Sequence, residues 1–308
     1  MTTDIKLFDL TKDPATEIPG RSSAVERSLH DLIERHLEAM LGIRLLGSEY
    51  DTGRKHGGRI DTLGIDENNS PAIIEYKRST NQNVINQGLF YMDWLLDHRA
   101  EFELLVLRTL GEETADLIDW SAPRLLCIAG GFTRYDEHAV EQMNRNIELI
   151  RYRRFGEGLL MLEMVNAVSA ATPASTGTRA SGLSATKGGA QKTFSQVLAS
   201  LDGPLLDLYE ALRDHILELG DDVQEKTLKR YVAFKRLKNF ACIDLRPREG
   251  TVLMYLKVDP GTVTLTDNFT RDVREISHYG TGDLEVTMRT PEDLERAKAL
   301  LQESYDAS

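Results

Sequence analysis

Hydrophobic residues in the first half of the chain follow two spacings, one typical of helices and one typical of strands. Leu29, Ile33 and Leu37 recur at helical spacing, whereas several later apolar runs have the length of buried strands. Residues 67–71 form a turn-forming cluster between two of these strands. The expected elements are, in order, a helix at 23–41, strands at 43–50, 59–66 and 72–79, a helix at 82–109, a strand at 124–129, a helix at 138–145, and strands at 147–155 and 159–165.

Residues 166–192 differ from both flanks, because alanine, serine, threonine and glycine dominate and bulky aliphatic residues are nearly absent. Such a segment buries too little apolar surface to offset the entropy of ordering it. It is predicted to be a flexible linker between an α/β domain at 1–165 and a smaller α+β domain at 193–308. The second domain is expected to contain a helix at 194–219, strands at 231–236, 240–245, 252–258 and 284–289, and a final helix at 291–305 capped by Thr290.

The chain is acidic, with a formal net charge of −12, and this opposes binding of nucleic acid over the whole surface. A localised basic channel remains compatible with that total. No apolar run approaches the roughly 20 residues that cross a bilayer, so no membrane partner is expected. Residues 1–19 are mixed and acidic and do not resemble a signal peptide, and the expected location is therefore the cytoplasm.

Cys127 and Cys242 each lie in an apolar, strand-like run in different halves of the chain. We expect both to be buried thiols, since two isolated cysteines make neither a disulfide framework nor a cysteine-rich zinc site. The sequence has no glycine-rich phosphate-binding motif before a helix, so nucleotide cofactors are not indicated.

Asp61, Glu75 and Lys77 are the residues most suited to chemistry. Glu75 and Lys77 are two apart on one predicted strand and point to the same face. Asp61 lies on the preceding strand, and a hairpin through the turn at 67–71 can bring it beside Glu75. Two carboxylates supply the hard oxygen ligands that Mg²⁺ prefers, and a lysine can orient or deprotonate a water molecule.

Gly58-Arg59-Ile60-Asp61, followed 14 residues later by Glu75-Tyr76-Lys77, resembles the core of the PD-(D/E)xK nuclease superfamily, especially its mismatch-type endonuclease and RecB-like groups. The resemblance covers roughly residues 20–165, and the proline of the superfamily's name is Ile60 here, at a widely variable position. It implies a restriction-endonuclease-like mixed sheet flanked by helices. It also implies an endonuclease that acts on DNA, or alternatively RNA, with Mg²⁺ or Mn²⁺. Related nucleases often act as homodimers, which is an analogy only.

The resemblance further implies a supporting acidic residue on the first core helix, which Glu26 fits, and a Gln-x-x-x-Tyr motif, which Gln87 and Tyr91 fit. Each has a structural alternative. Ser23 and Glu26 also form a capping-box pattern at the start of a helix. Gln87 and Tyr91 share one face of a helix that would pack through Val84, Gly88, Tyr91 and Leu95, with Gln87 at its rim.

Basic residues flank the motif and are candidates for contact with the DNA backbone, although ordinary surface charge explains them equally well. These residues are Arg54, Lys55, Arg59 and Arg78, with Arg151, Arg153 and Arg154 as a further basic strand.

Residues 226–248 contain eight lysines and arginines against one acidic residue, Asp244, with Tyr231, Phe234 and Phe240 interleaved. This pattern fits either stacking of aromatic rings on nucleic-acid bases or a core with a solvated charged face. Residues 195–305 also resemble a domain of unknown function found at the C-terminus of nuclease-like proteins, which implies no activity.

Three functions therefore follow from the sequence. The first is a magnesium-dependent DNA endonuclease, with Asp61 and Glu75 as metal ligands, Lys77 activating water, and Glu26 and Gln87 in support. The second is a non-catalytic nucleic-acid-binding protein on the same fold. The third is a regulatory protein that acts through interactions of its C-terminal domain.

Overall fold

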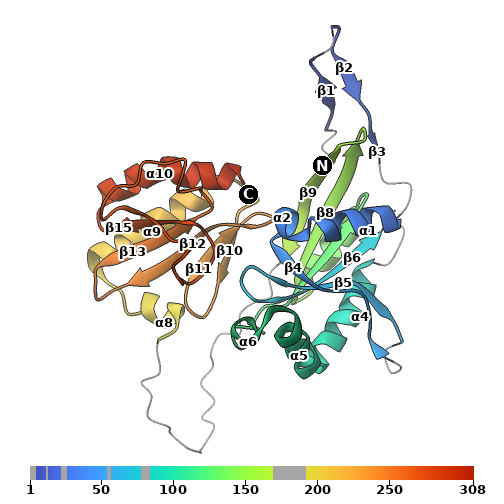
Figure 1. The fold of residues 1–308 in the computed structure, drawn as a ribbon, viewed down its shortest axis with the longest axis horizontal. Coiled ribbons are helices and arrows are strands. Elements are labelled where there is room, and N and C mark those ends of the chain that lie inside the picture. The colour runs from blue at the N-terminus through green and yellow to red at the C-terminus, as the bar shows by residue number, and fades with distance from the viewer. Residues whose placement is uncertain (1–4, 12, 22–25, 54–56, 78–83, 169–191) are drawn as a thin grey trace, which may run out of the picture. The chain divides into compact units, whose positions relative to one another are not determined.

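The computed structural model describes residues 5–11, 13–21, 26–53, 57–77, 84–168 and 192–308 (Figure 1). The chain divides into two units, Met1–Thr172 and Pro173–Ser308, and both combine helices with β-sheet. In the part of the chain that is described, no helix is long and apolar enough to cross a membrane.

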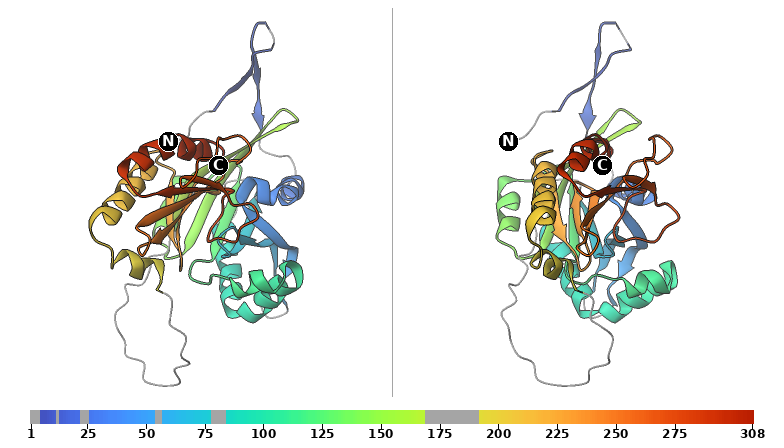
Figure 2. Two further views of the ribbon diagram at one scale, coloured as in Figure 1. Left: turned by 60° about the vertical axis from the view of Figure 1, so that its left-hand side comes forward. Right: turned by 90° about the vertical axis from the view of Figure 1, so that its left-hand side faces the viewer.

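The N-terminal unit is built on a mixed sheet with the strand order β3-β8-β7-β6-β5-β4, and β9 pairs with β8. Three strands form an antiparallel meander: β4 (Ile43–Asp51), β5 (Arg59–Asp66) and β6 (Pro71–Lys77). Two strands continue the sheet in parallel with β6: β7 (Arg124–Ala129) and β8 (Asn146–Phe155). Two strands pair antiparallel with β8: β3 (Gly20–Arg21) and β9 (Leu159–Val168). A separate ribbon consists of β1 (Leu7–Asp9) and β2 (Thr16–Ile18) (Figure 2).

The two long helices predicted for this unit are each divided. The first is α1 (Glu26–Arg35) and α2 (Leu37–Leu41), separated by His36; residues 22–25 lie outside the described part. The second is α4 (Val84–Asp97) and α5 (Arg99–Leu110), separated by His98, whose ring nitrogen Nδ1 lies 2.8 Å from the Trp94 carbonyl oxygen. The side chain thus engages a carbonyl at the helix end, and the chain turns. Apolar spacing continues across both breaks and could not reveal them.

Two further boundaries differ from the prediction. The helix α7 (Arg134–Glu141) begins before residue 138, because Thr133 and Asp136 form a capping box at its start. Strand β9 continues to Val168, so residues 166–168 belong to the sheet and the predicted linker is wrong there. Residues 169–191 of that linker lie outside the described residues. The short helix α6 (Glu112–Asp116) was not predicted.

The hairpin that joins β5 to β6 is held by a buried charge network. Asp66 Oδ1 accepts hydrogen bonds from the backbone N–H groups of Asn68 and Ser70, at 2.9 and 2.8 Å. Its other oxygen, Oδ2, accepts from Arg124 at 3.0 Å, and Arg124 also binds both oxygens of Glu148. The network ties the turn to β7 and β8 and so fixes the register of β5 against β6.

Helices cover both faces of this sheet (Figure 1). On one face, α4 packs against β6 and β7 through the predicted positions Val84, Gly88, Tyr91 and Leu95, which are all buried. On the other, α1 packs against β6. The active-site candidates lie on strands held between these helices.

The C-terminal unit contains an antiparallel sheet with the order β10-β11-β12-β13-β15-β14. Its strands are β10 (Gln224–Thr227), β11 (Val232–Lys235), β12 (Asn239–Arg246), β13 (Thr251–Leu256), β14 (Thr270–Asp272) and β15 (Leu284–Met288). Strands β10 and β14 were not predicted. The predicted helix at 194–219 is divided into α8 (Phe194–Leu198) and α9 (Gly203–Leu217), because Pro204 favours a new helix start. The last helix, α10 (Pro291–Asp306), is capped by Thr290 as predicted.

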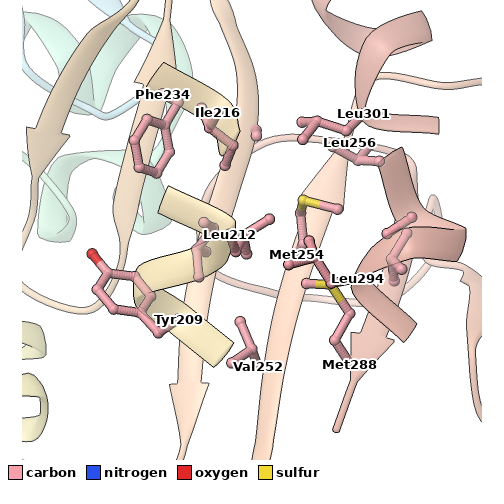
Figure 3. Packing of buried hydrophobic residues seen from close by; sticks show 14 of the residues in the cluster. Tyr209, Leu212, Ile216, Phe234, Val252, Met254, Leu256, Met288, Leu294 and Leu301 are labelled. Carbon is pink, nitrogen blue, oxygen red and sulfur yellow. The ribbon is translucent and has the colours of Figure 1, made fainter. Parts of the chain in front are cut away.

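One face of this sheet forms the core with α9 and α10. Figure 3 shows Leu212 and Ile216 of α9 and Leu294 and Leu301 of α10 around Met254 of β13. Two of the three aromatic residues that alternate with basic residues, Phe234 and Phe240, belong to this core, and Tyr231 is buried in a smaller cluster with Cys242. Buried rings cannot stack on bases, so the stacking interpretation is wrong for them. Cys127 and Cys242 are buried free thiols, as predicted.

Candidate active site

The strands β5 and β6 part where the candidate residues lie. They pair from Ile65 opposite Pro71 to Thr62 opposite Ile74, and no further. Beyond that point β5 stays paired with β4 as far as Arg59, and β6 stays paired with β7 as far as Lys77. Asp61 and Glu75 are the next residues on the two parting strands. They therefore face each other across an opening in the ladder, where side chains replace the missing backbone pairing.

Two hydrogen bonds connect Asp61 to β6 across this opening, one to Glu75 and one to Tyr76. The backbone N–H of Asp61 donates to Glu75 Oε1 at 3.2 Å, and the backbone N–H of Tyr76 donates to Asp61 Oδ2 at 3.0 Å. Lys77 lies two residues after Glu75 and is half-buried, and its charge stabilises the Glu75 carboxylate. The structure thus brings together the three residues on which the prediction rests.

Glu75 is fully buried, and its protonation is strongly perturbed. Burial raises the pKa of Glu75 to about 9, and the nearby Asp61 charge adds to the rise. The backbone hydrogen bond from Asp61 and the charge of Lys77 act in the opposite direction without cancelling it. Among the described residues, Glu75 Oε2 has no hydrogen-bond partner. A buried carboxylate that lacks a partner for one oxygen is well suited to a cation.

The donor set fits a hard divalent cation. Two carboxylates from neighbouring strands converge, and Mg²⁺ is commonly bound through one or two carboxylates, with water and substrate phosphate completing its octahedron. The described residues contain no group of three or more histidine, cysteine, aspartate or glutamate side chains placed to hold a metal ion. The pair Asp61 and Glu75 could supply two carboxylate oxygens to such a cation.

A polar network that the sequence analysis missed lies behind the strands, beneath α1. Thr62 Oγ1 donates to Glu34 Oε1 at 2.6 Å and lies 3.2 Å from the Tyr76 hydroxyl. Glu34 also pairs with His30 Nε2 at 2.8 Å, and the His30 ring packs on Tyr76 at 5.0 Å. The hydrogen bond that the His30 ring donates to the Glu34 carboxylate raises the pKa of His30. Thr62 and Tyr76 directly follow Asp61 and Glu75, so the network holds the backbone that carries both carboxylates.

Replacing Thr62 by valine is expected to destabilise the protein by about 1–3 kcal/mol. Valine keeps the shape but leaves Glu34 and Tyr76 without their shared hydroxyl in a buried site. Urea unfolding measures the effect. Thr251→Val is the matched control, because Thr251 is equally buried and its hydroxyl has no hydrogen-bond partner among the described residues. Equal stability losses in the two variants would contradict the network's role.

The predicted supporting residues have fewer defined contacts with the site than Asp61, Glu75 and Lys77. Tyr91 is buried and packs against Gly58, where its hydroxyl oxygen would lie 2.7 Å from an added Cβ. Gly58 precedes Asp61 by three residues, so α4 reaches the site through this contact. Gln87 is half-buried one turn earlier on α4, and its role stays a prediction. Glu26 is the first residue of α1, but its side chain lies outside the described part of the chain.

The basic residues predicted to contact the DNA backbone differ in how exposed their side chains are. Arg59 is exposed beside the site and pairs with Glu49 Oε2 at 3.0 Å, a surface ion pair that contributes little stability. Arg151 is buried and pairs with Glu163 at 3.3 Å, which makes it a structural residue. Arg153 and Arg154 are half-buried on β8. Arg54, Lys55 and Arg78 lie outside the described residues.

Comparison with known proteins gives two matches. Residues 193–308 match the family "Domain of unknown function (DUF5655)", which corresponds to the C-terminal sheet and its helices. An "Uncharacterized protein" from Haemophilus influenzae (strain ATCC 51907 / DSM 11121 / KW20 / Rd) is 26% identical over 307 residues, and the alignment covers 97% of this chain and 99% of that protein. No solved structure matches the chain. The relative is similar along both units, and neither match has an assigned activity.

Proposed function

We propose that the N-terminal unit is a metal-dependent endonuclease that hydrolyses phosphodiester bonds in DNA. The observation that carries this proposal is the parting of β5 and β6, which places Asp61, Glu75 and Lys77 together. Their order along the chain is the one that the resemblance to PD-(D/E)xK nucleases implies. The sequence of elements α1, β4, β5, β6, α4 and β7 also supports a restriction-endonuclease-like arrangement for this mixed α/β unit.

Each residue has a role that follows from its position. Asp61 and Glu75 would hold Mg²⁺ or Mn²⁺, which supplies Lewis-acid stabilisation of charge on the phosphate and acidifies a bound water. Tyr76 N–H fixes the orientation of Asp61 by its hydrogen bond to Oδ2. Lys77 lies on the same face as Glu75, where its ammonium can orient the attacking water and stabilise negative charge on the phosphate. Arg59, exposed at the edge of the site, is placed to contact the DNA backbone.

A cleavage assay with the purified full-length protein tests the proposal. We expect strand scission on at least one of four DNA substrates, namely duplex, branched, mismatched or single-stranded, when Mg²⁺ or Mn²⁺ is present. Excess chelator should abolish the cleavage, and added metal should restore it, because the two carboxylates bind the ion reversibly. An RNA substrate in parallel tests the alternative nucleic acid. A folded protein that cuts none of these substrates with either metal would show that the proposal is wrong.

A further inference from the structure

A second site of different chemistry lies within the C-terminal unit. A hollow of about 820 Å³ opens between α8 and the turn that joins β12 to β13. Arg230, in the segment before β11, and Tyr279, in the segment before β15, complete its walls. This volume falls in the range typical of sites for small organic ligands.

The hollow is positively charged although the whole chain is acidic. Four cationic residues line it against the two acidic residues Asp244 and Glu249. Asp244 is compensated by Arg246, whose Nη2 lies 2.6 Å from Oδ2. The other three cations are Lys192, Arg230 and Arg248, and none of them forms an ion pair with a residue that the structure describes. The excess positive charge is therefore available to an anion.

The cations come from three separate segments of the chain. Lys192 precedes α8, Arg230 precedes β11, and Arg248 follows β12. Arg230 donates a hydrogen bond to the Lys192 carbonyl oxygen at 3.3 Å, and this contact draws two of the segments together. Like charges repel, so their convergence has an electrostatic cost, which is small because Lys192 and Arg248 are exposed. An anionic ligand would offset that cost.

The walls of the hollow also offer an apolar surface. Val197 and Tyr279 are half-buried and Pro247 is exposed at the rim, whereas Phe194 and Leu245 also line the hollow but are packed in the core of this unit. Inorganic phosphate would use the cations but leave this surface empty. A ligand with a phosphate and a flat ring whose faces are apolar would use both, and a nucleotide has that chemistry.

We propose that this hollow binds a nucleotide unit. Arg230 and Arg248 would bind the phosphate, and the base would lie against Tyr279. The nucleotide could be free or part of a single strand, and the chemistry of recognition is the same in both cases. This proposal does not rest on the nuclease activity of the N-terminal unit.

Binding to the full-length protein in chelator, where cleavage cannot occur, tests the proposal. The probes are adenosine monophosphate, inorganic phosphate, and fluorescent single-stranded DNA of about ten nucleotides. The test variant is Arg230→Gln with Arg248→Gln. The control is Arg296→Gln with Lys298→Gln, which removes the same charge from the surface of α10.

We expect the test variant to lose about tenfold or more in affinity for a nucleotide probe, because one charge-assisted hydrogen bond alone corresponds to roughly that factor. The control should keep its affinity. Variant-sensitive binding of adenosine monophosphate would identify a free nucleotide as the ligand, and variant-sensitive binding of the oligonucleotide alone would identify a strand. The proposal would be overturned by no nucleotide binding, by inorganic phosphate binding as tightly as the nucleotides, or by equal effects in the two double variants.

Discussion

Asp61→Asn is expected to lower the rate of DNA cleavage by about a thousandfold or more, because loss of one metal-binding carboxylate removes several kcal/mol of charge stabilisation. The substitution keeps the size of the side chain, and the asparagine Oδ1 can still accept the hydrogen bond from Tyr76 N–H. The fold should therefore survive. Single-turnover cleavage at saturating Mg²⁺ measures the effect, and the unfolding temperature confirms the fold.

Asp93→Asn provides the matched control for Asp61→Asn. Asp93 is exposed on α4 in the same unit, so the same chemical change occurs away from the two parting strands. It should leave the cleavage rate unchanged within about twofold, as is usual for surface changes away from a site. If Asp61→Asn cleaved DNA as fast as Asp93→Asn, Asp61 would not be a metal ligand.

Glu75→Gln is expected to stabilise the metal-free protein at neutral pH while abolishing cleavage. Burial and Asp61 raise the pKa of Glu75 to about 9, so the folded state binds more protons than the unfolded state from about pH 4.5 upward. Stability therefore falls as pH rises toward 9. Glutamine cannot ionise and removes this loss, which corresponds to roughly 3–4 kcal/mol at pH 7. Below about pH 4 the two proteins should be similarly stable.

Glu148→Gln is the matched control, and it is expected to change stability in the opposite direction. Glu148 is also a buried glutamate, but both its oxygens accept hydrogen bonds from Arg124, at 2.7 and 2.8 Å. Weakening this pair should destabilise the protein by about 1–3 kcal/mol, because a buried charge-assisted hydrogen bond is lost while Asp66 still balances the Arg124 charge. The unfolding temperatures of the two variants, measured in the presence of chelator at a series of pH values, test both predictions. Destabilisation by Glu75→Gln at pH 7–8 would contradict the protonated state inferred for Glu75.

The strands that carry the candidate site were predictable for a physical reason. Strands β5 and β7 have the predicted bounds, because each is a short apolar run bracketed by polar or turn residues. The breaks at His36 and His98 were not predictable, since apolar spacing continues through them and tertiary packing decides where the chain turns. Side-chain hydrogen bonds to neighbouring carbonyls leave no periodic trace in a sequence.

The residues of the candidate site likewise divide into those that the sequence could predict and those that it could not. Asp61, Glu75 and Lys77 could be singled out because alternation along a strand and the length of a hairpin place them together. The network of Glu34 and Thr62 depends on how α1 lies on the sheet, which sequence spacing alone does not reveal. The cationic residues of the C-terminal hollow could be predicted only in part from the sequence. Most fall in the basic segment 226–248, but the convergence of Lys192 and Tyr279 on it is a tertiary property.

Titration calorimetry of Mg²⁺ and Mn²⁺ binding tests the central claim most directly. At one pH between 7 and 8, two buffers of different ionisation enthalpy report how many protons are released. Because Glu75 is largely protonated there, we expect ion binding to release about one proton, and both binding and release to be lost in Asp61→Asn and Glu75→Gln. Absence of binding, or binding that neither substitution weakens, would contradict a metal centre between β5 and β6.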